Sequence, residues 1–228
     1  MSMHTSRNQV GNSGRHRARV GRFAARMGIA LATVAAVTGC TSKQMEGESA
    51  SYLQIDAIQA ASGAEPEKFG GHLPSDVVTL GGVIEDLGQV TLRTVMKDPG
   101  SVSSPTLPSS TNLVTVNRYH VRYIRSDGRN VQGVDVPYEF DGAFTLTAPG
   151  AGATAIFPLV RVQAKLESPL RALRGLGGAI AISTLAEITF FGFDQAGREV
   201  KVTGTISVNF ADWADPESGG EGGNGGGE

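Results

Sequence analysis

The chain has 228 residues, a formal net charge of −2 and a single cysteine. One cysteine excludes an internal disulfide framework and a zinc site built from several thiolates. The charge lacks the basic excess that a domain needs to bind phosphate backbones, which excludes nucleic acid as a partner. The length corresponds to one domain, only marginally to two, and 40% hydrophobic residues supply an apolar core.

The N-terminal segment has the organisation of a secretory signal. Residues 1–26 contain six arginines and no acidic residue, and residues 27–39 (MGIALATVAAVTG) carry no charge. A basic region followed by a short apolar region and small residues is the pattern of an exported precursor. As a helix the apolar run would span about 20 Å, which is short of a ~30 Å hydrocarbon core, so a transmembrane helix is not expected.

The cysteine ends this apolar run in the sequence Val37-Thr38-Gly39-Cys40. That arrangement resembles the lipobox of a bacterial lipoprotein precursor. The resemblance implies cleavage between Gly39 and Cys40 and acylation of Cys40 with chains such as palmitate. Several acyl chains on one residue hold a protein firmly in a membrane. An ordinary signal peptide with an incidental cysteine and an organellar presequence are the alternatives.

The same resemblance implies the location and charge of the mature protein. It would be exported to the bacterial cell envelope and held by membrane lipid through Cys40. Thr41, rather than aspartate, follows the cysteine, which favours the outer membrane if the source has two membranes. Cleavage removes six arginines and no acid, so the net charge moves from −2 to −8.

Composition divides the chain into four parts. Polar residues after the cysteine would form a tether about 17–20 Å long, and the Gly-rich acidic C-terminus cannot bury apolar surface. The predicted parts are a signal peptide (1–39), the lipidated cysteine with a flexible tether (40–51), a folded domain (52–216) and a disordered tail (217–228).

Alternation of apolar and polar residues, the signature of half-buried strands, dominates the folded part. The clearest case is residues 200–210 (VKVTGTISVNF), which residues 194–197 join to the preceding strand as a hairpin. For residues 52–61 the periodicity fits helix or strand, and we favour strand. Pro158 predicts an edge position or a bulge in its strand. The predicted strands are 52–61, 90–96, 113–124, 134–140, 144–146, 156–166, 187–193 and 200–210, with Asp127-Gly128 and Asp141-Gly142 as turns.

The remaining segments connect these strands. Residues 98–111 form a Pro/Ser-rich loop. Ser168 as N-cap and Pro169 at the first helical position predict a short helix ending near Gly177. Residues 150–155 imitate a dinucleotide fingerprint but lie between two predicted strands, which indicates a hairpin loop. Together the pattern predicts an all-β fold, an antiparallel β-sandwich that is loosely immunoglobulin-like, with one short helix.

No catalytic, metal or cofactor site is predicted. After the leader only His72 and His120 remain, without metal-ligand spacing, and no GxSxG nucleophile motif occurs beyond it. Loop carboxylates are numerous, and two of them about 5 Å apart would suit a glycosidase. Sequence spacing does not bring any two together, so a non-catalytic protein is favoured over an enzyme.

One strand face carries the candidate partner-binding residues Arg118, His120 and Arg122, which alternate with apolar neighbours. This stripe could meet an acidic partner, or it is simply a solvated face. We therefore expect a membrane-anchored envelope lipoprotein whose sandwich binds another envelope protein or a surface polymer. The alternatives are an envelope hydrolase or carbohydrate-active enzyme using loop carboxylates, and a carrier of lipid or another small ligand.

Overall fold

The computed structural model describes residues 48–215. The predicted signal peptide, the lipidation site at Cys40 and the Gly-rich tail lie outside the described residues. Within residues 48–215, no helix is both long and apolar enough to cross a membrane.

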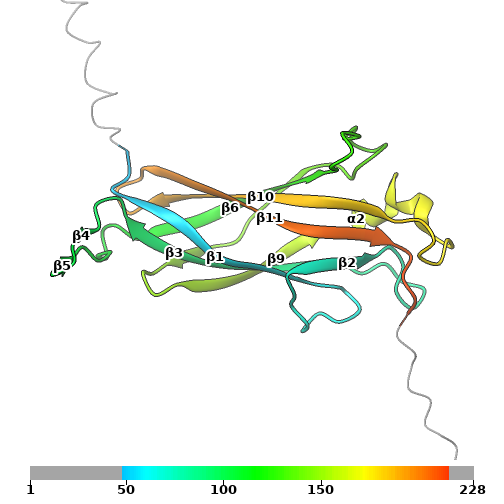
Figure 1. The fold of residues 1–228 in the computed structure, drawn as a ribbon, viewed down its shortest axis with the longest axis horizontal. Helices are drawn as coiled ribbons and strands as arrows, with labels where there is room; N and C mark the ends of the chain where they lie inside the picture. The colour runs from blue at the N-terminus through cyan, green and yellow to red at the C-terminus, as the bar shows by residue number, and fades with distance from the viewer. Residues whose placement is uncertain (1–47, 216–228) are drawn as a thin grey trace, which may run out of the picture. The chain divides into compact units, whose positions relative to one another are not determined.

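Two β-sheets pack face to face, which confirms the predicted all-β sandwich (Figure 1). Every strand pair is antiparallel except β2 and β11, which run parallel. The smaller sheet has the order β1-β3-β9, with β1 Ser51–Ala61, β3 Asp86–Met96 and β9 Ala153–Val160. The larger sheet has the order β2-β11-β10-β6-β7, with β8 also paired to β6; its strands are β2 His72–Asp76, β6 Val114–Ile124, β7 Phe140–Gly142, β8 Leu146–Ala148, β10 Ile182–Asp194 and β11 Glu199–Ala211.

Alternate residues from both sheets form one core. Its centre is an aromatic cluster in which Phe157 of the smaller sheet meets Tyr119 and Phe190 of the larger one, with ring centroids 4.8 and 5.5 Å away. These three side chains are almost fully buried. Aromatic side chains of this size supply much of the apolar area that stabilises such a core.

Bulges reverse the alternation of inward residues within two long strands. In β1 the pairing with β3 shifts between Ile55 and Ala57, so Leu53 and Ile55 face inward before the shift and Ile58 faces inward after it. The resulting three-residue spacing of Ile55 and Ile58 imitates a helix, which explains why the sequence fitted both structures. In β6 a shift near Asn117 acts in the same way.

The predicted strand at 134–140 is wrong. The segment forms turns in which the carbonyl of Val131 accepts hydrogen bonds from the backbone N–H of Val134, Asp135 and Val136. Pairing begins only at Phe140, so Asp141-Gly142 lies in β7 rather than in a turn. Val134 lies in a turn and Val136 forms an isolated bridge with Gln132, so their period-2 spacing does not reflect a strand.

The region after β9 also differs from the prediction. The strand expected over 156–166 ends at Val160, and a short α-helix, α2 (Val162–Leu166), follows. The helix expected after Ser168 is instead a 3₁₀ turn, η1 (Leu170–Leu173). Residues 150–155 do not close a hairpin, because β8 and β9 belong to different sheets. Pro158 does lie in an edge strand with a register shift, as predicted.

The two ends of the sandwich carry different connections. The Pro/Ser-rich loop forms a small hairpin of β4 (Gly100–Ser101) and β5 (Ser104–Pro105) at one end, and α2 lies at the other (Figure 1). Near the first described residues, Glu48 pairs with Lys97 at 2.9 Å, and the Lys97 N–H donates to the carbonyl of Ala50. Backbone and side chain therefore both attach this segment to the end of β3.

Replacing Gly192 with alanine is expected to destabilise the domain by about 2 kcal/mol. Gly192 lies at the bulge opposite Asn117, and a Cβ there would lie 2.9 Å from the backbone Cα of Val116. Backbone cannot rotate away as a side chain can. Denaturant unfolding measures the effect, with Gly71→Ala as the control because a Cβ at Gly71 meets no atom within 4 Å. Equal stability of the two variants would contradict this account.

Candidate functional site

A cleft opens where β7 faces the chain that leaves β9. Its volume is about 440 Å³, within the range of small-ligand sites. Glu85, Tyr119 and Arg161 contribute polar groups to it, and the ring of Phe140 contributes an apolar wall. The remaining lining residues are Asp141, Gly142, Ala143, Pro158, Val162 and Gln163.

Arg161 is the distinctive residue of this cleft. Its guanidinium carbon lies 4.1 Å from the centroid of the Phe140 ring, a cation–π contact that orients the planar group. Its Nε atom is buried without a hydrogen-bond partner, and no described carboxylate forms an ion pair with it. A guanidinium presents five N–H donors, so this cation has unused capacity for an incoming acceptor.

Tyr119 forms the floor of the cleft. Its hydroxyl donates a hydrogen bond to the carbonyl oxygen of Pro158 at 3.1 Å, across the two sheets. Burial raises the pKa of Tyr119 to about 12, so the group stays neutral and keeps its role as donor. Gly142 lies directly against the Tyr119 ring, where any larger residue would overlap it.

Two carboxylates line the same cleft but differ in their surroundings. Asp141 accepts a hydrogen bond from Arg118 Nη1 at 3.0 Å and lies 3.4 Å from His120 Nδ1. Glu85 is exposed and forms no ion pair or hydrogen bond with the residues that the structure describes. The cleft therefore contains one unpaired cation and one unpaired anion.

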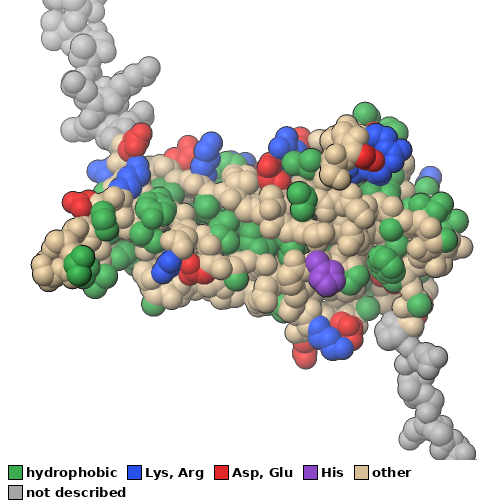
Figure 2. All heavy atoms as spheres, in the orientation of Figure 1, with side chains coloured by type: hydrophobic (Ala, Val, Ile, Leu, Met, Phe, Trp, Pro, Cys, Tyr) green, Lys and Arg blue, Asp and Glu red, His purple; other side chains and the backbone are tan. Residues whose placement is uncertain are grey.

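The predicted stripe of Arg118, His120 and Arg122 does lie on one outward face of β6, but each member has an acidic neighbour. Arg122 Nη2 contacts Glu187 Oε1 at 2.8 Å, and His120 Nε2 lies 3.6 Å from Glu139 Oε2. Figure 2 likewise shows basic and acidic side chains next to one another along the drawn face. The positive charge of the stripe is thus offset by neighbouring carboxylates. The stripe meets the cleft at Asp141, which also lines a shallow depression of about 630 Å³.

A buried ionic network lies behind the cleft and was not anticipated from sequence. Lys165 and Asp86 are 1% and 0% exposed, and Lys165 Nζ lies 2.8 Å from Asp86 Oδ1. The alternation of residues 156–166 placed Lys165 on a strand, whereas the short helix α2 directs it into the core. Asp86 was one of many carboxylates, and only the fold distinguishes it from the others.

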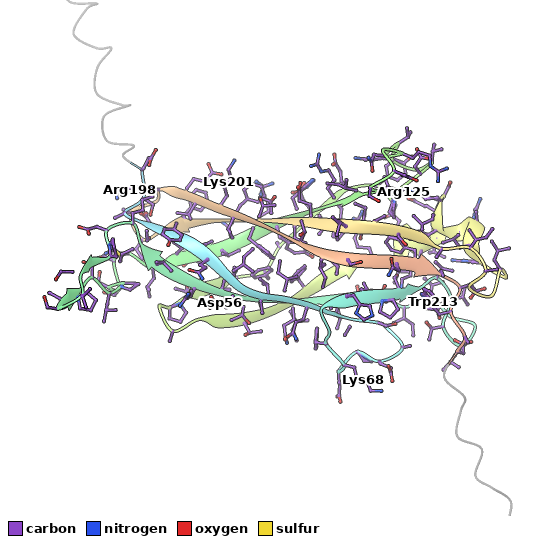
Figure 3. The ribbon with its side chains drawn as sticks, in the orientation of Figure 1. Asp56, Lys68, Arg125, Arg198, Lys201 and Trp213 are labelled. Carbon is purple, nitrogen blue, oxygen red and sulfur yellow. The ribbon has the colours of Figure 1, made fainter. Side chains whose placement is uncertain are left out.

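The other charged clusters have structural roles. Asp127 accepts hydrogen bonds from the Arg125 guanidinium, which lowers the pKa of that carboxyl, and this pair caps a turn beyond β6. Figure 3 shows Arg125 and Lys68 on opposite edges of the sandwich.

Asp76 contacts the last described residues of the chain. It accepts hydrogen bonds from the backbone N–H of Trp213 and from Thr79 Oγ1. Burial raises the pKa of Asp76. Figure 3 shows Trp213 just past the end of β11, so these bonds fasten the last described residues to the domain.

Within residues 48–215, no three His, Cys, Asp or Glu side chains gather in a way that could hold a metal ion. His72 begins β2 and is exposed. Comparison with protein-family models, with curated proteins and with solved structures gives no significant match. Function must therefore be inferred from the side chains themselves.

Replacing Tyr123 with phenylalanine is expected to lower the free energy of unfolding by about 1–3 kcal/mol. The buried hydroxyl of Tyr123 donates to the carbonyl oxygen of Leu159 at 2.6 Å, and its loss leaves that acceptor without a partner. Tyr52→Phe, which alters an exposed tyrosine, is the control. Chemical denaturation of both variants would contradict the assignment if Tyr123→Phe were as stable as the control.

Proposed function

We propose that this protein is a lipid-anchored, non-catalytic binding protein of the bacterial envelope whose cleft at Arg161 holds a carboxylate-bearing surface polymer. The observation that carries the proposal is that Arg161 lines an open cleft and forms no ion pair with a carboxylate among the described residues. A guanidinium matches a carboxylate through two parallel N–H···O hydrogen bonds, which gives both affinity and orientation. The stacked Phe140 ring fixes the plane in which those donors lie.

The opposite charge in the cleft narrows the class of ligand. Glu85 would repel a ligand that carried only negative charge, but it would accept hydrogen bonds from hydroxyl groups. A uronic acid residue carries one carboxylate and several hydroxyls on one ring. It therefore offers an acceptor to Arg161 and donors to Glu85, and both residues line the same cleft.

The sequence at Cys40 supports the anchoring part of the proposal. An Arg-rich start, a short apolar run and Val37-Thr38-Gly39-Cys40 together resemble an acylated precursor. Anchoring raises the local concentration of a binding domain at the surface, so a modest affinity for each sugar unit is sufficient when the polymer repeats its epitope.

An envelope hydrolase is the second candidate, because Glu85 and Asp141 line the same cleft. A pair of carboxylates on either side of a sugar is the arrangement that glycosidases use. Against this role, Asp141 already accepts a hydrogen bond from Arg118 and contacts His120. We favour binding because the available cation has no part in that two-carboxylate chemistry.

The protein is expected to bind oligosaccharides of galacturonic acid, and Arg161→Gln is expected to weaken binding at least about tenfold. A charge-assisted hydrogen bond contributes about 1.5–3 kcal/mol, which corresponds to that factor or more. Calorimetry on the mature chain measures the affinity. Arg171→Gln is the matched control, because Arg171 is an exposed arginine outside the cleft.

The same oligosaccharide with its carboxyl groups reduced to alcohols is expected not to bind. Equal binding of the reduced sugar, or an absence of binding to either sugar, would contradict recognition of a carboxylate at Arg161. Shortening of the oligosaccharide during incubation, abolished by Glu85→Gln, would instead favour the hydrolase.

Cys40→Ala is expected to move the protein from the membrane fraction to the soluble or uncleaved pool, because the acyl chains attach through the thiol. Fractionation with detection of the mature domain measures this, and Ser42→Ala, two residues away, is the control. Full retention of a cleaved Cys40→Ala protein in the membrane would contradict lipid anchoring.

A further inference from the structure

Lys165 and Asp86 form an ion pair inside the core, where ion pairs are costly. Each side chain is at most 1% exposed, and Nζ lies 2.8 Å from Oδ1. Removing an ammonium and a carboxylate from water costs several kcal/mol for each ion, which their attraction only partly offsets. Burial raises the pKa of the Asp86 carboxyl, which moves it toward the neutral acid.

The hydrogen bonds around Lys165 fit an amide better than an ammonium. An ammonium has three N–H donors, but the structure provides two acceptors for them, Asp86 Oδ1 and the carbonyl oxygen of Ile84 at 2.6 Å. A secondary amide has a single N–H, for which the Ile84 carbonyl is a sufficient partner. An amide would also carry no charge in this dry environment.

The partners of the Asp86 carboxyl would direct the chemistry. The backbone N–H of Gly63 donates to Oδ1 at 2.9 Å, in position to stabilise negative charge on that oxygen in a tetrahedral intermediate. Ser75 Oγ donates to Oδ2 at 2.6 Å and can carry a proton to it. Oδ1 is thus positioned to remain as the amide oxygen, and Oδ2 is positioned to leave as water.

We propose that Lys165 and Asp86 become joined by an intramolecular isopeptide bond between Nζ and Cγ. A proton first passes from Nζ to the carboxyl group, which leaves a neutral amine and a carboxylic acid protonated on Oδ2. The nitrogen lone pair attacks Cγ to form the C–N bond, and a second proton moves from nitrogen to Oδ2. The C–Oδ2 bond then breaks and releases one water, while one N–H remains on the amide and no other reactant is needed.

The bond would close a long loop. Asp86 begins β3, and Lys165 lies 79 residues later in α2. A covalent link of this span removes conformational freedom from the unfolded chain, as a disulfide does. The chain has a single cysteine and cannot form an internal disulfide. The isopeptide bond would give an exported domain a covalent crosslink that it cannot obtain from a disulfide.

Peptide mapping of the full native chain tests the proposal directly. After denaturation, trypsin cleaves behind lysine and arginine, so an unmodified chain yields separate peptides 69–93 and 162–165. A chain with the isopeptide resists cleavage at Lys165 and yields one branched peptide of 69–93 and 162–171. Its mass equals the mass of peptide 69–93 plus the mass of peptide 162–171, minus the mass of one water. We expect essentially all of the folded protein to give the branched peptide.

Lys68 provides a control within the same digest. It forms an ion pair with Glu65, but both side chains are exposed, so water stabilises the charges and no amide should form. Cleavage behind Lys68 must therefore be complete. Lys165→Arg keeps the positive charge without a nucleophilic amine and should never give the branched product, whereas Ser75→Ala should give it in reduced yield.

Recovery of peptides 69–93 and 162–165 in full yield from the folded wild-type protein would overturn the proposal. The readout depends on the wild-type chain, so it holds even if a variant fails to fold. It is also independent of the proposed function, since ligand binding at Arg161 is measured separately and either result leaves the other standing.

Discussion

The Asp86 side chain is the constraint on which the rest of this fold depends. It joins four segments: it begins β3, accepts from Gly63 after β1 and from Ser75 in β2, and pairs with Lys165 of α2. Because β2 belongs to the larger sheet and β3 to the smaller, one side chain links both layers. A buried polar side chain with this many partners fixes the relative position of the segments, since each displaced partner would leave a polar group unsatisfied in the core.

The cleft follows from that link. Glu85 directly precedes Asp86, and Arg161 lies one helical turn before Lys165, whose N–H donates to the Arg161 carbonyl at 3.4 Å. Glu85 and Arg161, the two unpaired charged residues of the cleft, are therefore held by backbone that is fixed through Asp86 and Lys165. A site on backbone that is held in this way needs little reorganisation to receive a ligand, which favours affinity.

The cross-sheet tyrosines complete the support. The register shift at Pro158 disrupts the β3–β9 ladder at the edge of the smaller sheet, and the hydroxyls of Tyr119 and Tyr123 donate to the carbonyls of Pro158 and Leu159. Bulges commonly occur at sheet edges and beside functional sites, where they redirect side chains. Here the shift precedes the turn of the chain that carries Arg161 into the cleft.

Sequence patterns predicted the elements that obey a single period. The β10–β11 hairpin was correct, because alternation and turn residues are local properties. The strand β6 was also found, because the residues on either side of its bulge near Asn117 still alternate, and the edge position of Pro158 follows from its missing N–H. Residues 134–140 and Lys165 were misassigned because alternating apolar residues occur equally well in successive turns or across a strand–helix junction. Arg118, His120 and Arg122 were correctly placed on one face, but Glu139, Asp141 and Glu187 come from other strands or loops, so their neutralisation of the stripe could not be read from spacing.

The cleft itself was hidden for the same reason. Glu85, Tyr119, Phe140 and Arg161 come from four separate segments, and none lies in a local motif. What the sequence contains beside them is a lysine between Ala164 and Leu166, shortly after a strand that carries Pro158. A charged residue that the fold buries must have a partner, so the search for a partner of Lys165 leads to Asp86, and from there to the cleft that both residues support.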